Sequence, residues 1–215
     1  MATELQEATE VFCRAAEQSI EGELEALGLN NAKAVYTIAR GSSDAAANIL
    51  SYEFMRELGI PVTSLPPSVF SVGAGVSMAH AAGLVISQSG ASEDLVRAAA
   101  GIREKGGAVA AITNVPGSGV EKAANATLRI GAGEEKAVPA TKTVIGSVGA
   151  GLALLAAMKP EYAKALRASS QAFATVGNLS EDQHRALKSA LLRARHVYVV
   201  GRDTGFGAAH EVALK

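Results

Sequence analysis

Three serines and a glutamine lie close together in residues 83–95, Gly-Leu-Val-Ile-Ser-Gln-Ser-Gly-Ala-Ser-Glu-Asp-Leu. The apolar run before them is typical of a strand buried on both faces, and the acids Glu93 and Asp94 are typical of a helix start. Backbone N–H groups at a helix N-terminus have no partner within the helix, so hydroxyl and amide donors beside them suit a phosphate. The candidate phosphate-binding residues are Ser87, Gln88, Ser89 and Ser92. Taken alone, the stretch also fits an ordinary serine-rich turn.

A second polar turn follows an earlier apolar run. Residues 34–39, Ala-Val-Tyr-Thr-Ile-Ala, are typical of a strand, and Arg-Gly-Ser-Ser-Asp at 40–44 leads into a predicted helix that ends near Leu58. Ligands of an open parallel sheet bind beyond the carboxyl ends of the strands, where two such turns face each other. Two serine turns at one edge are therefore better evidence for a ligand site than one, although Ser42 and Ser43 could also simply cap the helix.

Strands and helices alternate along the first three quarters of the chain. A leading helix is predicted over residues 4–27, and strands are predicted over 34–39, 62–65, 83–87, 108–113 and 127–130, each followed by a helix or short helical piece. This order predicts an α/β fold with three layers and a doubly wound parallel sheet, most simply of the flavodoxin-like type.

The chain contains an internal repeat that sets its domain organisation. Residues 35–43, Val-Tyr-Thr-Ile-Ala-Arg-Gly-Ser-Ser, and residues 197–205, Val-Tyr-Val-Val-Gly-Arg-Asp-Thr-Gly, share a pattern that an alanine-rich helix follows. We predict a leading helix (1–33), a first domain (34–158), a helical connector (159–194) and the start of a second domain (195–215). One strand-helix unit cannot bury its own apolar faces, so we expect either a fragment or a last segment that docks onto the first domain or another subunit.

Composition excludes several classes of protein. The 215 residues have a formal net charge of -1 without a basic cluster, which argues against nucleic acid as the main partner. No apolar run reaches the roughly 20 residues that span a bilayer, so we expect no membrane partner. The single cysteine, Cys13, cannot form an internal disulfide, and the cytoplasm is the expected compartment. We expect neither a metal nor a cofactor.

Four motifs occur in order: Ala-Arg-Gly-Ser-Ser (39–43), Ser-Gln-Ser-Gly-Ala-Ser-Glu-Asp (87–94), Ile-Thr-Asn-Val-Pro-Gly-Ser (112–118) and Val-Pro-Ala-Thr-Lys-Thr (138–143). Together they closely resemble the sugar isomerase (SIS) domain, in particular the isomerase part of glucosamine-6-phosphate synthase and of relatives that lack the glutaminase domain. The resemblance covers about residues 34–158. Residues 197–215 resemble the start of the second SIS domain of that family, which implies the same SIS fold for both.

The resemblance implies roles for particular residues. The family's Ser-Gln-Ser-Gly loop holds the phosphate of a sugar 6-phosphate, which assigns Ser87, Gln88, Ser89 and Ser92 to the phosphate, in agreement with the reasoning from residue types. The serine turn after the first strand contacts the sugar and corresponds to Ser43. Two further sugar contacts correspond to Val138 and Ala140, but Ala140 has no hydroxyl, so its contact could come only from the backbone.

The resemblance also implies an acid–base reaction, in which the sugar ring opens and a carboxylate moves a proton between C1 and C2. Glu211 and Lys215 match the Glu and Lys of a family motif in the second domain and are the candidate catalytic residues. The family's main catalytic Glu would follow Lys215, and its ring-opening histidine and C-terminal lysine have no counterpart here. We therefore expect the chain as printed to bind phosphosugar weakly and to catalyse little.

The implied activity is that of a homodimeric enzyme acting on glucosamine 6-phosphate or fructose 6-phosphate. Deamination, aldose–ketose isomerisation and aminotransfer remain open, but glutamine hydrolysis is unsupported because the chain begins Met-Ala-Thr before a helix and not with the family's nucleophilic cysteine. One alternative is a non-catalytic phosphosugar sensor, which usually carries a DNA-binding helix-turn-helix before the SIS domain. The other is a nucleotide-binding protein, whose Gly-x-Gly-x-x-Gly motif does not fit the serines after Gly41.

Overall fold

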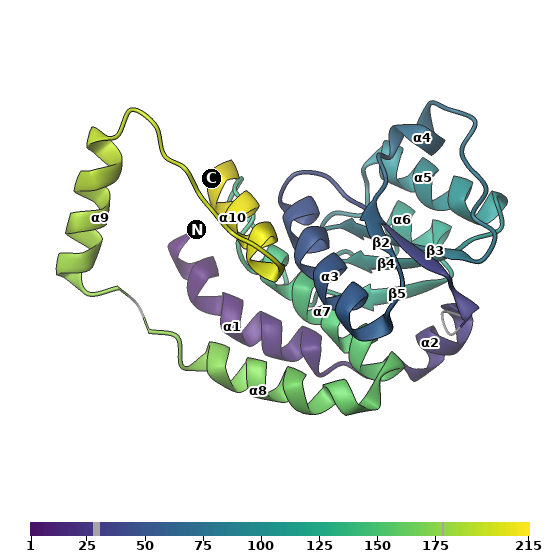
Figure 1. The fold of residues 1–215 in the computed structure, drawn as a ribbon, viewed down its shortest axis with the longest axis horizontal. Coiled ribbons are helices and arrows are strands. Elements are labelled where there is room, and N and C mark those ends of the chain that lie inside the picture. Colours follow the sequence, from purple (N-terminus) through teal and green to yellow (C-terminus); the bar gives the residue numbers. More distant parts are fainter. Residues whose placement is uncertain (28–30, 178) are drawn as a thin grey trace.

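A computed structural model describes residues 1–27, 31–177 and 179–215, and within them a five-stranded sheet has the order β2-β1-β3-β4-β5 (Figure 1). All of its strand pairings are parallel. The strands are β1 (Ala34–Ile38), β2 (Val62–Ser64), β3 (Ala81–Ser87), β4 (Ala108–Thr113) and β5 (Ala126–Arg129). This order confirms the doubly wound, flavodoxin-like α/β fold.

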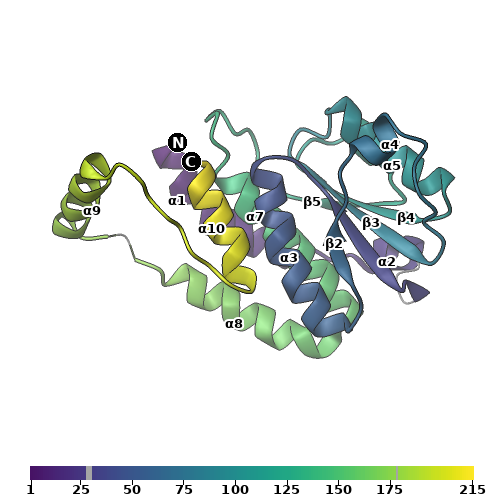
Figure 2. The ribbon, with the colours of Figure 1, turned by 45° about the horizontal axis from the view of Figure 1, so that its top comes forward.

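Helices cover both faces of the sheet (Figure 2). One face carries α1 (Ala2–Ala16), α2 (Glu21–Leu27), α3 (Ser42–Leu58) and α7 (Lys142–Met158), and the other carries α4 (Ser68–Ser71), α5 (Glu93–Glu104) and α6 (Gly119–Ala123). Each face has its own apolar cluster: Leu84 and Ile86 point into the first and Val85 into the second. This alternation follows from the two-residue period of a strand and explains the continuous apolar run of β3.

The prediction of one leading helix over residues 4–27 is wrong, because that segment forms two helices, α1 and α2. Gln18 lies at the break and pairs its side-chain amide with the edge of β5. It accepts a hydrogen bond from Arg129 N (2.9 Å) and donates to Arg129 O (3.0 Å) and Ala15 O (2.7 Å). A continuous helix would keep the backbone regular but would leave these groups of the edge strand without that partner.

Small residues in α7 let two other helices approach it closely. A Cβ atom on Gly149 would lie 2.7 Å from Phe12 O of α1, and one on Gly151 would lie 2.4 Å from Leu50 Cδ1 of α3. Side chains from Lys142 to Leu155 are mostly buried, as the apolar sequence predicts. The helix therefore lies inside the first domain, between α1, α3 and the sheet.

The C-terminal quarter continues through α8 (Ala163–Ala174), α9 (Glu181–Arg193) and α10 (Thr204–Leu214). Figure 1 shows α9 standing apart from the sheet, and none of its residues is buried. The α10 helix docks onto α3, since a Cβ atom on Gly207 would lie only 2.6 Å from Ala45 O.

Among the described residues, no helix is both long enough and apolar enough to cross a membrane.

The repeat at residues 197–205 does not form the strand that its pattern favours. Residues 196–200 are in no strand, and Val197, Tyr198 and Val200 are 56%, 87% and 90% exposed. A strand needs a neighbour for its backbone hydrogen bonds, and none lies beside this segment in the part of the chain described. The assignment of residues 195–215 to a second domain stays a prediction.

Candidate functional site

The two serine turns follow two neighbouring strands whose next helices cover opposite faces of the sheet. β1 and β3 are neighbours, but α3 after β1 covers one face and α5 after β3 covers the other. In open α/β sheets such a switch point leaves a crevice outside the carboxyl ends of the strands. An ion pair of 2.9 Å between Arg40 Nη1 and Asp94 Oδ2 joins the two turns directly. The turn that contains Ser43 and the stretch that contains the predicted phosphate contacts are thus joined at this switch point.

Residues 87–92, here called the serine cup, are shaped by their own hydroxyls. Ser87 Oγ accepts a hydrogen bond from Gly90 N (3.1 Å), and Ser89 Oγ accepts one from Ala91 N (3.3 Å). Ser92 is the N-cap of α5, but its side chain makes no capping hydrogen bond. Because each serine bond uses only the oxygen as acceptor, the hydroxyl hydrogens can still be donated to an anion.

Glycine is required at position 90. Its φ is +61°, and a Cβ atom there would lie 2.2 Å from Ser118 Oγ and 2.8 Å from Thr113 Oγ1. The cup therefore rests against the turn after β4. Val120 N donates to Gly90 O (2.9 Å) and Asn114 N donates to Gln88 O (3.0 Å). Reasoning from residue types missed this support, because polar turn residues such as Asn114 and Ser118 are common in loops and carry no signal of their own.

The turn after β1 lies beside the end of the chain. Gly41 has a φ of +57°, and Ser42 and Ser43 open α3. Lys215 Nζ donates to Ser42 Oγ at 3.0 Å. A cavity of about 300 Å³ lies here, lined by Gly41, Ser42, Val138, Pro139, Leu214 and Lys215. The structure thus brings Val138 and Lys215 together, two residues that the sequence assigned to the site separately.

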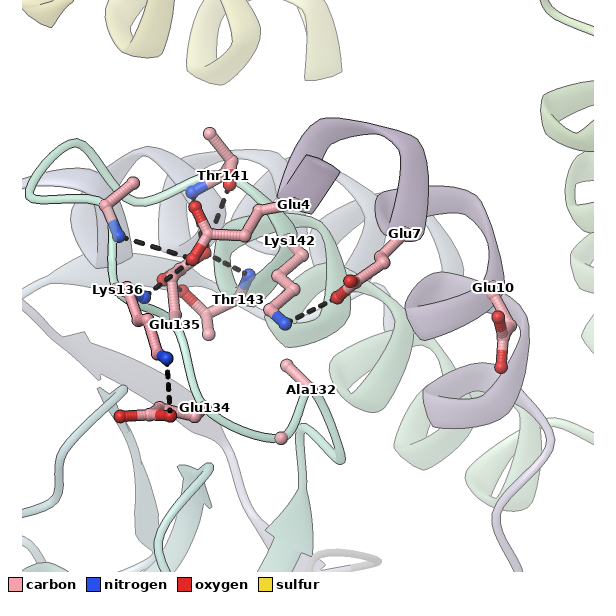
Figure 3. Close-up of polar contacts among 12 residues, drawn as sticks. Glu4, Glu7, Glu10, Ala132, Glu134, Glu135, Lys136, Thr141, Lys142 and Thr143 are labelled. Carbon is pink, nitrogen blue, oxygen red and sulfur yellow. Dashed lines mark hydrogen bonds and ion pairs between the residues drawn. The ribbon is translucent and has the colours of Figure 1, made fainter. Parts of the chain in front are cut away.

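A carboxylate from the loop before α7 caps that helix (Figure 3). Glu135 Oε1 accepts hydrogen bonds from Thr141 N (2.9 Å) and Thr143 N (3.2 Å), and both threonine hydroxyls also donate to this carboxylate. A negative charge at a helix N-terminus is favoured by the helix dipole and by the free N–H groups. Glu135 thereby fixes the loop of residues 131–141 to α7.

The same loop is held from the other side by α1. Glu4 Oε1 accepts from Lys136 N (2.6 Å) and Ala137 N (3.3 Å), and Lys142 Nζ lies 2.6 Å from Glu7 Oε2. The hydrogen bond with the amino-terminal ammonium, and next the Lys136 N–H, lower the pKa of Glu4 to about 2. The carboxylate is therefore ionised at neutral pH. These contacts leave the tip of the loop projecting, with Val138 99% exposed.

Glu211 on α10 and Lys215, the residue after that helix, form an ion pair. Lys215 Nζ lies 2.9 Å from Glu211 Oε1, and the Glu211 side chain is 18% exposed. Both carboxylate oxygens are buried without a well-aligned hydrogen-bond donor among the described residues. Lys215 therefore links this carboxylate to Ser42 across the space between α10 and α3.

Other predicted residues lie outside the cavity of about 300 Å³, whose lining includes neither the serine cup nor Ser43, Ala140 or Glu211. A larger cavity of about 710 Å³ lies between α2 and β5, and none of the predicted site residues lines it. Among the described residues, no group of three or more His, Cys, Asp or Glu side chains is placed to hold a metal ion.

Comparison with known proteins identifies relatives of this chain. A family model described as SIS domain matches residues 28–157. The glutamine–fructose-6-phosphate aminotransferase (isomerizing) of Oceanobacillus iheyensis is 30% identical over 197 residues, which are 87% of this chain and 32% of that protein. The chain thus spans about a third of the length of this relative.

Solved structures share the fold. A crystal structure of a candidate phosphosugar isomerase from Silicibacter pomeroyi superposes with a TM-score of 0.87 and 34% identity, covering 99% of this chain and 66% of that one. The Vibrio vulnificus NanR protein, complexed with ManNAc-6P, shares the fold at a TM-score of 0.59 and 18% identity, covering 80% of this chain and 68% of that one. The family match covers more than half of the chain and establishes that the protein belongs to the SIS domain family.

Proposed function

We propose that the crevice between β1 and β3 binds a sugar 6-phosphate with its phosphate in the serine cup. The observation that carries this proposal is the position of the cup at the start of α5, a twelve-residue helix, at the switch point of the sheet. The free backbone N–H groups of the first turn of α5 lie next in sequence to the hydroxyls of Ser87, Ser89 and Ser92. Such a set of neutral donors beside a helix dipole favours a phosphate.

The sugar part would extend from the cup toward the turn after β1. In this proposal Ser43 and Val138 contact the sugar, and Ala140 contributes only its backbone. The ion pair of Arg40 and Asp94 supports the proposal because it holds the two turns within reach of one small ligand, at 2.9 Å between the charged groups. A sugar phosphate is the ligand class that matches both a phosphate cup and a neighbouring hydroxyl-rich turn.

We further propose an enzymatic role on an aminosugar or ketose 6-phosphate, such as glucosamine 6-phosphate or fructose 6-phosphate. The likeness to a glutamine–fructose-6-phosphate aminotransferase supports this substrate class. Lys215, which bonds Ser42 at 3.0 Å, would stabilise negative charge on substrate oxygens, and Glu211 would hold Lys215 in place. In this proposal the base that moves the proton between C1 and C2 belongs to a second SIS domain, whose start we predict at residues 195–215.

A sensor without catalysis is the second candidate, and the fold shared with NanR, complexed with ManNAc-6P, favours it. Both candidates predict phosphosugar binding in the cup. They differ in turnover by the complete natural protein, which can be followed by NMR of fructose 6-phosphate and glucosamine 6-phosphate. Conversion of either sugar supports the enzyme, whereas saturable binding without conversion supports the sensor.

The cup itself is tested by calorimetric titration with fructose 6-phosphate, inorganic phosphate and unphosphorylated fructose. We expect the first two to bind and fructose not to bind. Replacing Ser87 and Ser89 together by Ala should weaken fructose 6-phosphate binding tenfold or more, since each hydrogen bond to a charged group contributes about 1.5–3 kcal/mol. The control replaces Ser169 on α8 and Ser189 on α9, both outside the crevice. Equal affinities of the two double variants for fructose 6-phosphate would refute the proposal that the serine cup binds its phosphate.

A further inference from the structure

Asn114 connects two loops of the proposed site. It follows β4 directly, and its backbone N–H donates to Gln88 O in the serine cup at 3.0 Å. Its side chain faces the opposite loop: Nδ2 donates to Gly133 O at 2.6 Å, and Oδ1 accepts from Ala132 N at 2.8 Å. One residue thus holds the cup with its main chain and the loop of residues 131–141 with its side chain.

The sheet order explains why this residue reaches both loops. β4 lies between β3 and β5, so the residue after β4 stands between the loop that leaves β3 and the loop that leaves β5. A side-chain amide carries a donor and an acceptor like a peptide group. Asn114 therefore extends the pairing of β4 and β5 one step beyond the last backbone bond, from Ile130 N to Thr113 O at 3.1 Å.

The bonds of Asn114 begin a series of anchors along the loop of residues 131–141. Glu135 fixes the next part to α7, and Glu4 accepts from the N–H groups of Lys136 and Ala137. The series stops immediately before Val138, which is 99% exposed at the tip. The bonds of Asn114 thus hold the start of this segment, and the bonds of Glu135 and Glu4 hold the part next to the residue proposed to contact the sugar, so the position of Val138 depends on the whole series.

We propose that Asn114 is a positioning residue that couples the serine cup to the loop carrying Val138, so that filling the cup orders the sugar contact. This inference rests on the proposed function, because it assumes phosphate in the cup and sugar beside Val138. Phosphate that binds the cup fixes the peptide of Gln88, the Gln88 O–Asn114 N bond then holds Asn114, and the Asn114 amide holds Ala132 and Gly133.

The first test separates the two halves of the ligand. Asn114→Ala keeps the backbone N–H that supports Gln88 but removes both side-chain bonds to the loop. We expect the affinity for inorganic phosphate to change less than about twofold and that for fructose 6-phosphate to fall about fivefold or more, the effect of one or two neutral hydrogen bonds. Equal losses for both ligands, or a loss for neither, would overturn the coupling.

Asn125→Ala is the matched control. Asn125 Oδ1 accepts from Val109 N at 2.9 Å, so this variant also loses an asparagine bond to strand backbone, but at the opposite end of β4. We expect it to leave both affinities unchanged. Asn114→Leu serves as a second variant: its side chain has a similar size and no charge but can form neither bond to the loop, so the selective loss of fructose 6-phosphate affinity should recur.

The second test follows the loop itself by hydrogen–deuterium exchange. In the natural chain, inorganic phosphate should slow exchange of the amides of residues 132–137, which the phosphate does not touch, and in Asn114→Ala this protection should disappear. Phosphate binding without protection at 132–137, or equal protection in the variant, would overturn the inference. If the natural chain binds neither phosphate nor fructose 6-phosphate, the proposed function fails and the coupling with it. If both bind with equal sensitivity to Asn114→Ala, only the coupling fails.

Discussion

The two copies of the repeat have turns of nearly the same backbone conformation, but the residues before the turn are buried in the first copy and exposed in the second. Gly41 and Asp203, at equivalent positions, have φ and ψ angles of 57° and −133° and of 56° and −141°. Each begins a helix directly after this turn. Yet Val35 in β1 is 3% exposed between two neighbouring strands, whereas its equivalent Val197 is 56% exposed.

The comparison separates the structure that residues close in sequence determine from the structure that needs partners brought close by the fold. The turn and the helix after it form in both copies, because they depend on residues close in sequence. The strand forms only in the first copy, where β2 and β3 supply partners for its backbone. The first copy therefore holds its turn at the end of a paired strand, while the second copy contacts that turn through Lys215, the residue after α10.

The largest expected effect tests this difference directly with the pair Val35→Ala and Val197→Ala. Val35→Ala removes two methyl groups from a filled core and should lower the free energy of unfolding by about 2 kcal/mol. Val197→Ala should change it by less than about 0.5 kcal/mol, as is usual for exposed positions. Urea unfolding followed by circular dichroism measures both. Similar losses would mean that residues 197–200 are buried in solution, for instance by an added domain or a second copy.

Much of the fold could be predicted because the strands of the first domain are continuous apolar runs with clear polar ends. The predicted strand over 108–113 coincides with β4, and the serine cup was expected where the structure has it. The break at Gln18 was not predictable, since it depends on an edge strand more than a hundred residues away. The unpaired segment at residues 196–200 was missed for the same reason: its pattern is that of β1, but its neighbours are absent from the described residues.

The residues that support the candidate site could not be predicted for a similar reason, because their partners lie far away in the sequence. Glu4 lies on an amphipathic helix where acids are ordinary, and its partners Lys136 and Ala137 are 132 and 133 positions away. Glu135 is one of several charges in an irregular segment, and only the position of α7 turns it into a helix cap. Residue types indicate which groups can touch a ligand, but the groups that hold a loop in place follow from the tertiary structure.

An intermediate effect is expected where the second copy meets the first. A Cβ atom on Gly207 would lie 2.6 Å from Ala45 O and 2.8 Å from Ile49 N, backbone atoms that cannot move aside easily. Gly207→Ala should therefore separate α10 from α3 and speed amide exchange of residues 204–214 about tenfold, in line with overpacking costs of about 1–3 kcal/mol. Gly205→Ala is the control, because no atom beyond its chain neighbours and the nearby backbone of its own helix lies within 4 Å of its added Cβ. Equal exchange in the two variants would mean that α10 is not held by this close approach.

The smallest effect is expected at the arginines of the repeat, Arg40 and Arg202. Arg40 forms the 2.9 Å ion pair with Asp94 that joins the two turns, but its side chain is 67% exposed, so Arg40→Gln should cost no more than about 1 kcal/mol of stability. Fructose 6-phosphate affinity should nevertheless fall a fewfold at low salt, and this loss should shrink as salt screens the charges. Arg202→Gln, at the equivalent exposed position of the second copy, should change neither quantity. A salt-dependent loss of equal size in both variants would show that the two copies contribute alike to the crevice, and the contrast between a ligand-bearing first copy and a docking second copy would then fail.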